Sequence, residues 1–259
     1  MELKSFVISY VWMVSSFAVA RAAILWYYGT AYKPPIIPEG RKTMEGYSEY
    51  TKSALEILRR PELTMHWYAV PLLLITMYIV TKQLHEKNYK VVLGAFALWG
   101  VDIFNEIWNS MICFISGYAP VWGTPVGVGN TAWLLMIGYN IEISFMFLIM
   151  GVTVCLMLPE DPKGKILGIN NRIFYCIVLT TLAVIIECFL NYCGILTWEW
   201  AFWQRSCPWI LWLIGYLPFF ATAFYVHDRP TVKQSAAIVG GILGFDAILI
   251  VICACLGWI

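Results

Sequence analysis

The chain has 259 residues, of which 60% are hydrophobic and only 13% are charged, whereas soluble domains average about 45 to 50% apolar and 25% charged residues. This composition excludes a water-soluble globular protein. Its 17 Lys and Arg residues nearly balance its 16 Asp and Glu residues, so the net charge is +1. We therefore expect no nucleic acid as a partner.

Apolar stretches recur along the whole chain, and seven of them approach the roughly 20 residues that a helix needs to cross a bilayer. We therefore predict an all-α, polytopic membrane protein that forms a seven-transmembrane-helix bundle in one domain. The expected spans are residues 6–28, 66–80, 91–117, 131–158, 173–194, 208–226 and 236–258. Residues 29–65 then form an outer loop, whose apolar and charged residues suit either a short amphipathic helix or a solvated loop.

The distribution of basic residues predicts the orientation of the bundle. Most Lys and Arg residues of the short connections fall on the predicted side of the N-terminus, whereas the opposite short connections contain only Arg205. We therefore expect the N-terminus in the cytoplasm and the C-terminus outside. On the outer side, residues 117–130 carry no charge and residues 197–209 are rich in Trp; they form either an interfacial aromatic belt or a lid over a binding site.

Cysteine and histidine give no sign of a metal or cofactor. Most of the eight Cys lie singly in apolar spans, where Cys behaves as a small hydrophobe. Only Cys193 and Cys207 fall near the outer surface, where a disulfide is permitted but not required. Because His66, His85 and His227 lie near span ends, paired intramembrane haem ligands are not expected.

Intramembrane acids are the strongest feature of the sequence. A carboxylate in mid-membrane costs roughly 2.5 to 3.5 kcal/mol, so we expect acids in the spans to face the interior of the bundle. Arg21 is the one basic residue embedded with them. The five acids at predicted hydrocarbon depth are Asp102, Glu106, Glu142, Glu187 and Asp246.

Helical spacing predicts that several of these acids share a polar chamber. Asp102, Glu106 and Asn109 fall on one helical face, and low dielectric favours a protonated carboxyl that can donate a hydrogen bond or a proton. Alternatively, protonated acids simply join helices by hydrogen bonds. The predicted catalytic residues are Glu106, Asp102, Asp246 and Glu142, and the predicted substrate-binding residues are Asn105, Asn109, Asn140, Glu187, Asn191, Trp108, Tyr139 and Trp212.

Residues 85–109, HEKNYKVVLGAFALWGVDIFNEIWN, resemble the early helical hairpin of the integral-membrane terpene cyclases of meroterpenoid and indole-diterpene pathways. In that family a charged turn precedes a span with an Asn-x-x-x-Glu pattern, in which Asp102 here replaces Asn before Glu106. Asp246 matches the acid of the family's last span. The resemblance implies that Glu106 and Asp246 protonate an olefin or epoxide and direct ring closure.

Three functional hypotheses follow from these residues. The first is a membrane-embedded enzyme that acts on a lipid-soluble, isoprenoid-like substrate by carboxylic-acid catalysis, without a cofactor. Alternatives are a proton- or cation-coupled transporter or channel that uses the same acids, and a non-catalytic membrane subunit whose acids pair with a partner. Membrane lipid or an apolar small molecule is the expected ligand in the first case.

Overall fold

A computed structural model describes residues 45–58, 66–124 and 134–259. Its helices are α2 (Glu49–Leu58), α3 (Ala69–His85), α4 (Tyr89–Ser116), α5 (Ile141–Leu156), α6 (Asn171–Tyr192), α7 (Pro208–Ile210), α8 (Leu217–His227) and α9 (Val232–Leu256), and a π-helical segment, η2 (Leu211–Tyr216), joins α7 to α8. Two short antiparallel hairpins pair β1 (Leu134–Met136) with β2 (Tyr139–Asn140) and β3 (Lys165–Ile166) with β4 (Ile169–Asn170). The predicted helical fold is confirmed.

Four helical stretches in the described part of the chain are long and apolar enough to cross a membrane: α4, α6, the continuous Pro208–His227 and α9. The apolar helices α3 and α5 fall within or near two further predicted spans but have only 17 and 16 residues. The expected span 6–28 lies outside the described residues. The structure thus supports an integral membrane protein without establishing the count of seven spans.

The prediction that a span begins near residue 131 is wrong. Residues 134–140 form the β1–β2 hairpin, and α5 begins only at Ile141. Gly138 adopts a φ of +88° in the turn, which suits glycine because it has no Cβ. The side chain of Asn140 then caps α5 by accepting a hydrogen bond from the backbone N–H of Ile143 at 2.9 Å, so local turn and capping geometry override the apolar pattern.

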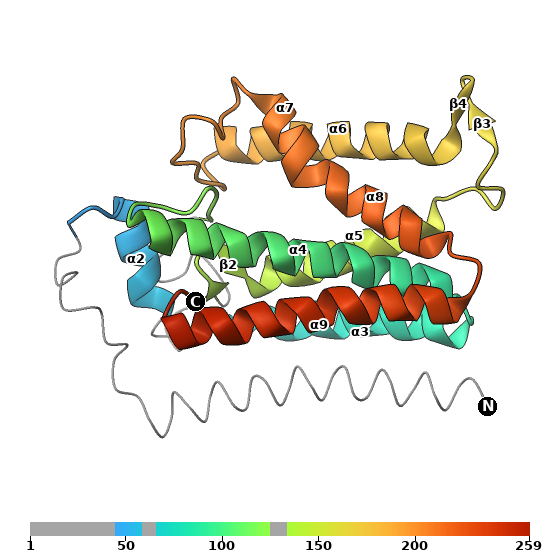
Figure 1. Ribbon diagram of the computed structural model, residues 1–259, viewed down its shortest axis with the longest axis horizontal. Coiled ribbons are helices and arrows are strands. Elements are labelled where there is room, and N and C mark those ends of the chain that lie inside the picture. Colours follow the sequence, from blue (N-terminus) through green and yellow to red (C-terminus); the bar gives the residue numbers. More distant parts are fainter. Residues whose placement is uncertain (1–44, 59–65, 125–133) are drawn as a thin grey trace.

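Helix α4 is the centre of the bundle. It packs against α5, α8 and α9, and Figure 1 shows it between α8 and α9 with α5 behind. Small residues permit this close packing: a Cβ on Gly151 of α5 would lie only 2.7 Å from Cα of Ala95. Helix α6 stands farther out and contacts α8 and η2, so one side of it remains available to lipid.

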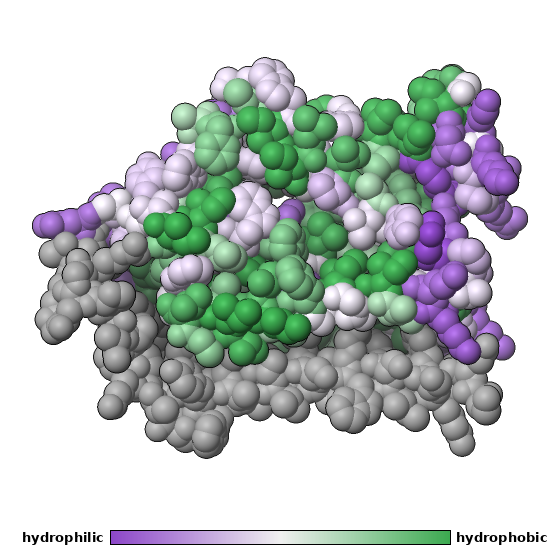
Figure 2. All heavy atoms as spheres, in the orientation of Figure 1, coloured by the Kyte–Doolittle hydropathy of each residue, from purple (hydrophilic) through white to green (hydrophobic). Residues whose placement is uncertain are grey.

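Polar residues collect at one end of the bundle, as Figure 2 shows. The α3–α4 turn, the β3–β4 hairpin and the α8–α9 turn all lie at this end (Figure 1). These connections carry Lys87, Lys163, Lys165 and Arg229. The segments that were predicted to share a membrane side are thus together, while their cytoplasmic orientation stays a prediction.

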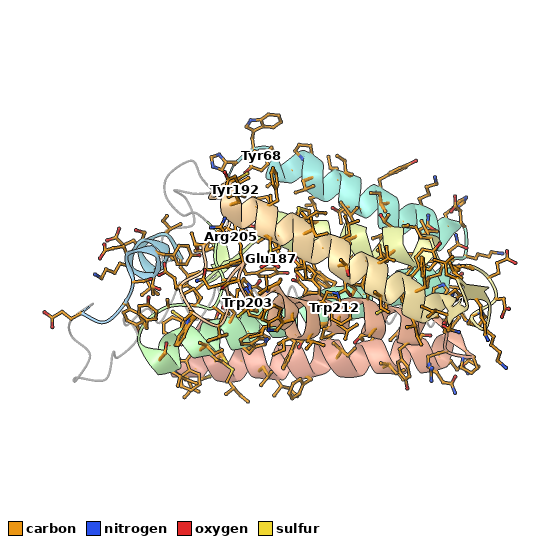
Figure 3. All side chains as sticks on the ribbon, turned by 90° about the horizontal axis from the view of Figure 1, so that it is seen from above. Tyr68, Glu187, Tyr192, Trp203, Arg205 and Trp212 are labelled. Carbon is orange, nitrogen blue, oxygen red and sulfur yellow. The ribbon has the colours of Figure 1, made fainter. Side chains whose placement is uncertain are left out.

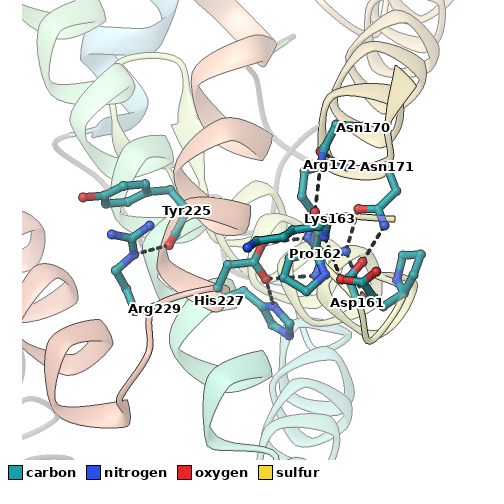
Figure 4. Close-up of polar contacts among 11 residues, drawn as sticks. Asp161, Pro162, Lys163, Asn170, Asn171, Arg172, Tyr225, His227 and Arg229 are labelled. Carbon is teal, nitrogen blue, oxygen red and sulfur yellow. Dashed lines mark hydrogen bonds and ion pairs between the residues drawn. The ribbon is translucent and has the colours of Figure 1, made fainter. Parts of the chain in front are cut away.

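An ion pair joins the ends of α6 and α8 in this polar region (Figure 4). Arg172 donates from Nε to Asp228 Oδ2 at 2.7 Å and from Nη2 to Oδ1 at 2.9 Å, and His227 Nδ1 lies 2.9 Å from the same Oδ1. Burial by itself would raise the pKa of Asp228, but the hydrogen bonds and charges of His227 and Arg172 hold it well below its usual range. Asp228 is therefore ionised in the folded protein.

Replacing Asp228 with Asn is expected to lower the free energy of unfolding by about 2 to 3 kcal/mol near neutral pH, because the bidentate charged pair is lost. The pKa of Asp228 is lower in the folded than in the unfolded chain, so its contribution is complete above the unfolded pKa of about 3.9 and declines as the pH falls further. Thermal unfolding in detergent should show the two proteins converging below about pH 4. Asp161→Asn, which removes only an exposed carboxylate that accepts from the Lys163 backbone, is the control; a constant difference across pH would contradict the assignment.

Candidate functional site

The acidic stripe of α4 is buried in the bundle. Asp102, Glu106 and Asn109 are 2%, 4% and 0% exposed. At 1.5 Å per residue, Asp102 and Glu106 lie roughly 20 and 26 Å along α4 from its first residue. Helix α6 begins at the same end of the bundle (Figure 1), and Glu187 lies roughly 24 Å along it. The three acids therefore occupy one layer, away from the polar end.

Glu106 is held by the connection that follows α4. The indole Nε1 of Trp122 donates to Glu106 Oε1 at 2.7 Å, and Asn109 Nδ2 lies 3.4 Å from Oε2. Asn109 also fixes that connection: its Oδ1 accepts from the backbone N–H of Val121 at 2.6 Å, and its Nδ2 donates to the carbonyl of Trp122 at 2.9 Å. One Asn side chain thus positions both the acid and the donor that faces it.

The β1–β2 hairpin holds Asp102. The hydroxyl of Tyr139 donates to Asp102 Oδ2 at 3.1 Å, and Tyr139 is itself buried. Nearby, the indole of Trp99 donates to Ser144 Oγ at 3.0 Å. The hairpin that interrupts the predicted span is therefore the element that brings Tyr139 to the acid.

Glu187 approaches the same place from α6. Its carboxyl lies among the hydroxyl of Tyr216 and the indole groups of Trp203 and Trp198, and Figure 3 shows Glu187 near Trp203. In the described part of the chain, neither indole N–H has another hydrogen-bond partner. Both therefore remain available to an acceptor at Glu187.

Aromatic contacts connect the two glutamates. The ring of Trp122, which donates to Glu106, lies 5.0 Å from the ring of Trp203 between centroids. Glu106 and Glu187 are also within electrostatic range of each other, and Tyr216 is within range of both Glu106 and Asp102. We define the acid site as these three acids with their donors: Asp102, Glu106, Glu187, Trp122, Tyr139, Trp203 and Tyr216.

A π-helical segment positions Tyr216. The segment spans Leu211–Tyr216, and such wide turns are rare and occur frequently at functional sites. It also orients Trp212, whose Nε1 donates to Thr181 Oγ1 of α6 at 3.0 Å. The irregular segment therefore ties α6 to α8 at the acid site.

Two predicted catalytic acids lie elsewhere. Glu142 Oε1 accepts a hydrogen bond from the hydroxyl of Tyr68 at 2.6 Å, at the start of α3. Asp246 packs against Gly100, where an added Cβ would lie 3.7 Å from Oδ2. Because Gly100 is two residues from Asp102, it faces roughly the opposite side of α4, and the structure does not bring Asp246 to the acid site.

Three predicted binding residues on and beside α4 make local hydrogen bonds. Trp108 Nε1 donates to Asn105 Oδ1 at 3.0 Å, one helical turn apart. Asn140 caps α5, as described above, and its Nδ2 lies 3.5 Å from Thr124 Oγ1. These contacts stabilise the surroundings of the acid site.

Asn191 and Trp212 are likewise engaged locally. Asn191 Nδ2 donates to the carbonyl of Leu196 at 3.0 Å and so orders the turn after α6. Trp212 bonds to α6. Beyond α6, Cys193 and Cys207 are free thiols, which resolves the pairing that the sequence left open.

Three residues of the acid site are absent from the predicted catalytic and binding residues: Trp122, Trp203 and Tyr216. The only sequence signal for Trp122 and Trp203 is their place in the uncharged segment 117–130 and the Trp-rich segment 197–209, each of which is predicted to be a belt or a lid. A Cβ on Gly123 would overlap the ring of Tyr50, so α2 covers this connection closely. Within residues 45–58, 66–124 and 134–259, no three His, Cys, Asp or Glu side chains are placed to hold a metal ion.

A family model and two relatives match this chain. The model of an uncharacterized membrane protein family matches residues 48–255, a range that contains the whole acid site. An uncharacterized protein of Archaeoglobus fulgidus is 47% identical over 207 residues, which cover 80% of this chain and 96% of the relative. Another from the same organism is 45% identical over 53 residues, 20% of this chain and 95% of that relative. No solved structure matches.

Proposed function

We propose that the acid site catalyses a proton-dependent rearrangement of a lipid-soluble, isoprenoid-like substrate. The chain belongs to the uncharacterized membrane protein family whose model it matches. One observation carries the proposal: three buried acids from two helices share a site with Trp and Tyr side chains. In the described residues the ion pairs join Lys52 to Glu49, and Arg172 and His227 to Asp228. No paired base neutralises the site in that part of the chain.

Glu106 is the proposed acid. In its protonated form it transfers the proton to a carbon of the substrate's double bond, and the two π electrons form the new C–H bond. The resulting carbocation would be stabilised by the faces of Trp122 and Trp203, since an aromatic face attracts a cation by about 0.5 to 2 kcal/mol. Loss of a proton to the carboxylate of Glu187 or Asp102 restores a double bond. Return of that proton to Glu106 restores the acid, so the net reaction is an isomerisation or cyclisation.

Neighbouring groups support this division of roles. Trp122 and Asn109 approach different oxygens of Glu106, which fixes the carboxyl plane. Tyr139 donates to Asp102 Oδ2, which fixes the direction of this second carboxyl. Burial excludes water that would otherwise capture a carbocation.

Solvent deuterium tests the proposal. Purified protein in detergent, supplied with acyclic isoprenoids in heavy water, should yield a product with one deuterium at the carbon that was protonated. The Glu56→Gln variant alters an exposed glutamate of α2 and should label its product equally. Absence of any product across the isoprenoid series, or a product without deuterium, would count against acid catalysis.

A second function is favoured by Asp246. This side chain is 1% exposed, and in the described part of the chain neither of its carboxyl oxygens has a hydrogen-bond partner. An intramembrane carboxyl of this kind suits a proton or cation pathway. Proton or cation flux in proteoliposomes that depends on Asp246, without isoprenoid turnover, would support transport instead.

A further inference from the structure

Arg205 lies toward the end of the bundle that is opposite its polar end. It belongs to the connection between α6 and α7 and is exposed. Its guanidinium carbon lies 5.6 Å from the centroid of the Tyr192 ring. Figure 3 shows Arg205 between Tyr192 and Glu187, and both Arg205 and Glu187 act electrostatically on Cys188. Arg205 therefore sits beside the α6 wall of the acid site.

The charge of Arg205 is not neutralised by a carboxylate of the described residues. None of the ion pairs there includes it, and Glu187 is surrounded by Tyr216, Trp203 and Trp198 instead. The contact with the Tyr192 ring is made through the positive charge of the guanidinium and does not use its N–H groups as hydrogen-bond donors. Those N–H groups form a planar fork that matches the oxygens of a phosphate.

Exposed aromatic residues belong to the same region of the chain as Arg205. Tyr192, Trp209 and Phe202 are 74%, 59% and 43% exposed. Aromatic side chains of this kind are typical of the membrane–water interface. A ligand that meets both these rings and the guanidinium needs an anionic head and an apolar chain.

We propose that Arg205, braced by Tyr192, binds the phosphate head group of an amphiphile whose apolar chain enters the acid site past Glu187. The inference rests on the proposed function, because it names the substrate class of that same site as a phosphate-bearing isoprenoid. The head group stays at the interface, where phosphate remains hydrated, while the chain reaches the buried acids. The proton transfer proposed for Glu106 leaves the phosphate ester intact.

Calorimetric titration of the full chain in a neutral detergent tests this binding. Farnesyl phosphate, farnesol and inorganic phosphate are the three probes. Farnesyl phosphate is expected to bind at least tenfold more tightly than either other probe. Arg205→Gln should weaken its binding at least tenfold, whereas Arg205→Lys, which keeps the charge but loses the fork, should weaken it by a smaller factor.

Arg229→Gln is the matched control. Its guanidinium carbon also lies over a tyrosine, 3.7 Å from the Tyr225 ring centroid, but at the opposite, polar end of the bundle. It should bind farnesyl phosphate like the wild type. Equal losses in the Arg205→Gln and Arg229→Gln variants, an unchanged Arg205→Gln variant, or equally tight binding of inorganic phosphate would overturn the proposal.

Glu106→Gln separates this inference from the proposed function. The variant should keep the tighter binding of farnesyl phosphate over farnesol and its dependence on Arg205, because Glu106 lies inside the bundle and not at the head group. Normal binding together with absent turnover in the wild type would refute the catalytic proposal alone. If uncharged isoprenoids are turned over normally and Arg205→Gln does not weaken the binding of farnesyl phosphate, the head-group site alone would be refuted.

Discussion

Replacing Glu106 with Gln is expected to reduce isoprenoid turnover at least about a hundredfold, the typical contribution of a positioned acid. Gln has nearly the same shape as Glu, and its amide oxygen can still accept the hydrogen bond that Trp122 donates at 2.7 Å. The amide cannot transfer a proton to carbon. The melting temperature should therefore stay near that of the wild type while the rate falls, which activity and thermal unfolding measured on the same preparation would show.

Two further variants make the Glu106 result specific. Glu56→Gln makes the same chemical change on the exposed face of α2 and should retain full activity. Trp122→Phe removes the donor to Glu106 but keeps an aromatic ring, so the carboxyl should remain functional but less well oriented, with an intermediate rate. A Glu106→Gln protein that keeps more than about a tenth of the wild-type rate would be incompatible with a positioned acid at this residue.

Replacing Gly138 with Ala is expected to disrupt the acid site and to destabilise the protein by more than about 3 kcal/mol, from overpacking and backbone strain together. Gly138 has a φ of +88°, and an added Cβ would lie 2.7 Å from the carbonyl oxygen of Trp122 and 2.9 Å from Asn109 Nδ2. Relief of these contacts requires the hairpin to separate from the Trp122 connection. Thermal unfolding should shift to lower temperature, and tryptophan emission should shift to longer wavelength as Trp122 becomes more exposed to water.

Gly168→Ala separates backbone strain from the steric effect. Gly168 lies in the β3–β4 hairpin with a comparable φ of +81°, and a Cβ there would meet nothing within 4 Å. Its replacement should cost only the left-handed backbone strain, about 1 to 2 kcal/mol, and should leave tryptophan emission unchanged. Equal effects of the two substitutions would show that contact with Trp122 and Asn109 has no part in the Gly138 result.

The amino-acid composition and the spacing of the acids along α4 were sufficient to predict several features of the protein. A 28-residue apolar helix with acids four residues apart must turn those acids away from lipid, because an exposed carboxylate at that depth costs too much free energy. The membrane class, the helical fold and the shared face of Asp102, Glu106 and Asn109 follow from that argument. Hydropathy did not identify the β1–β2 hairpin, because its residues are as apolar as a span and only Gly138 and Asn140 mark the turn.

Periodicity along one helix determines which residues share its face, and for that reason Asp102 and Glu106 could be paired from the sequence. It carries no information about which face of a neighbouring helix lies opposite. Packing between helices therefore decided that Glu187 joins these acids and that Asp246 lies beyond Gly100 on the other side of α4. It also decided that Trp122, 16 residues after Glu106 in the chain, donates to it, because a loop's path depends on the surfaces that it must cover.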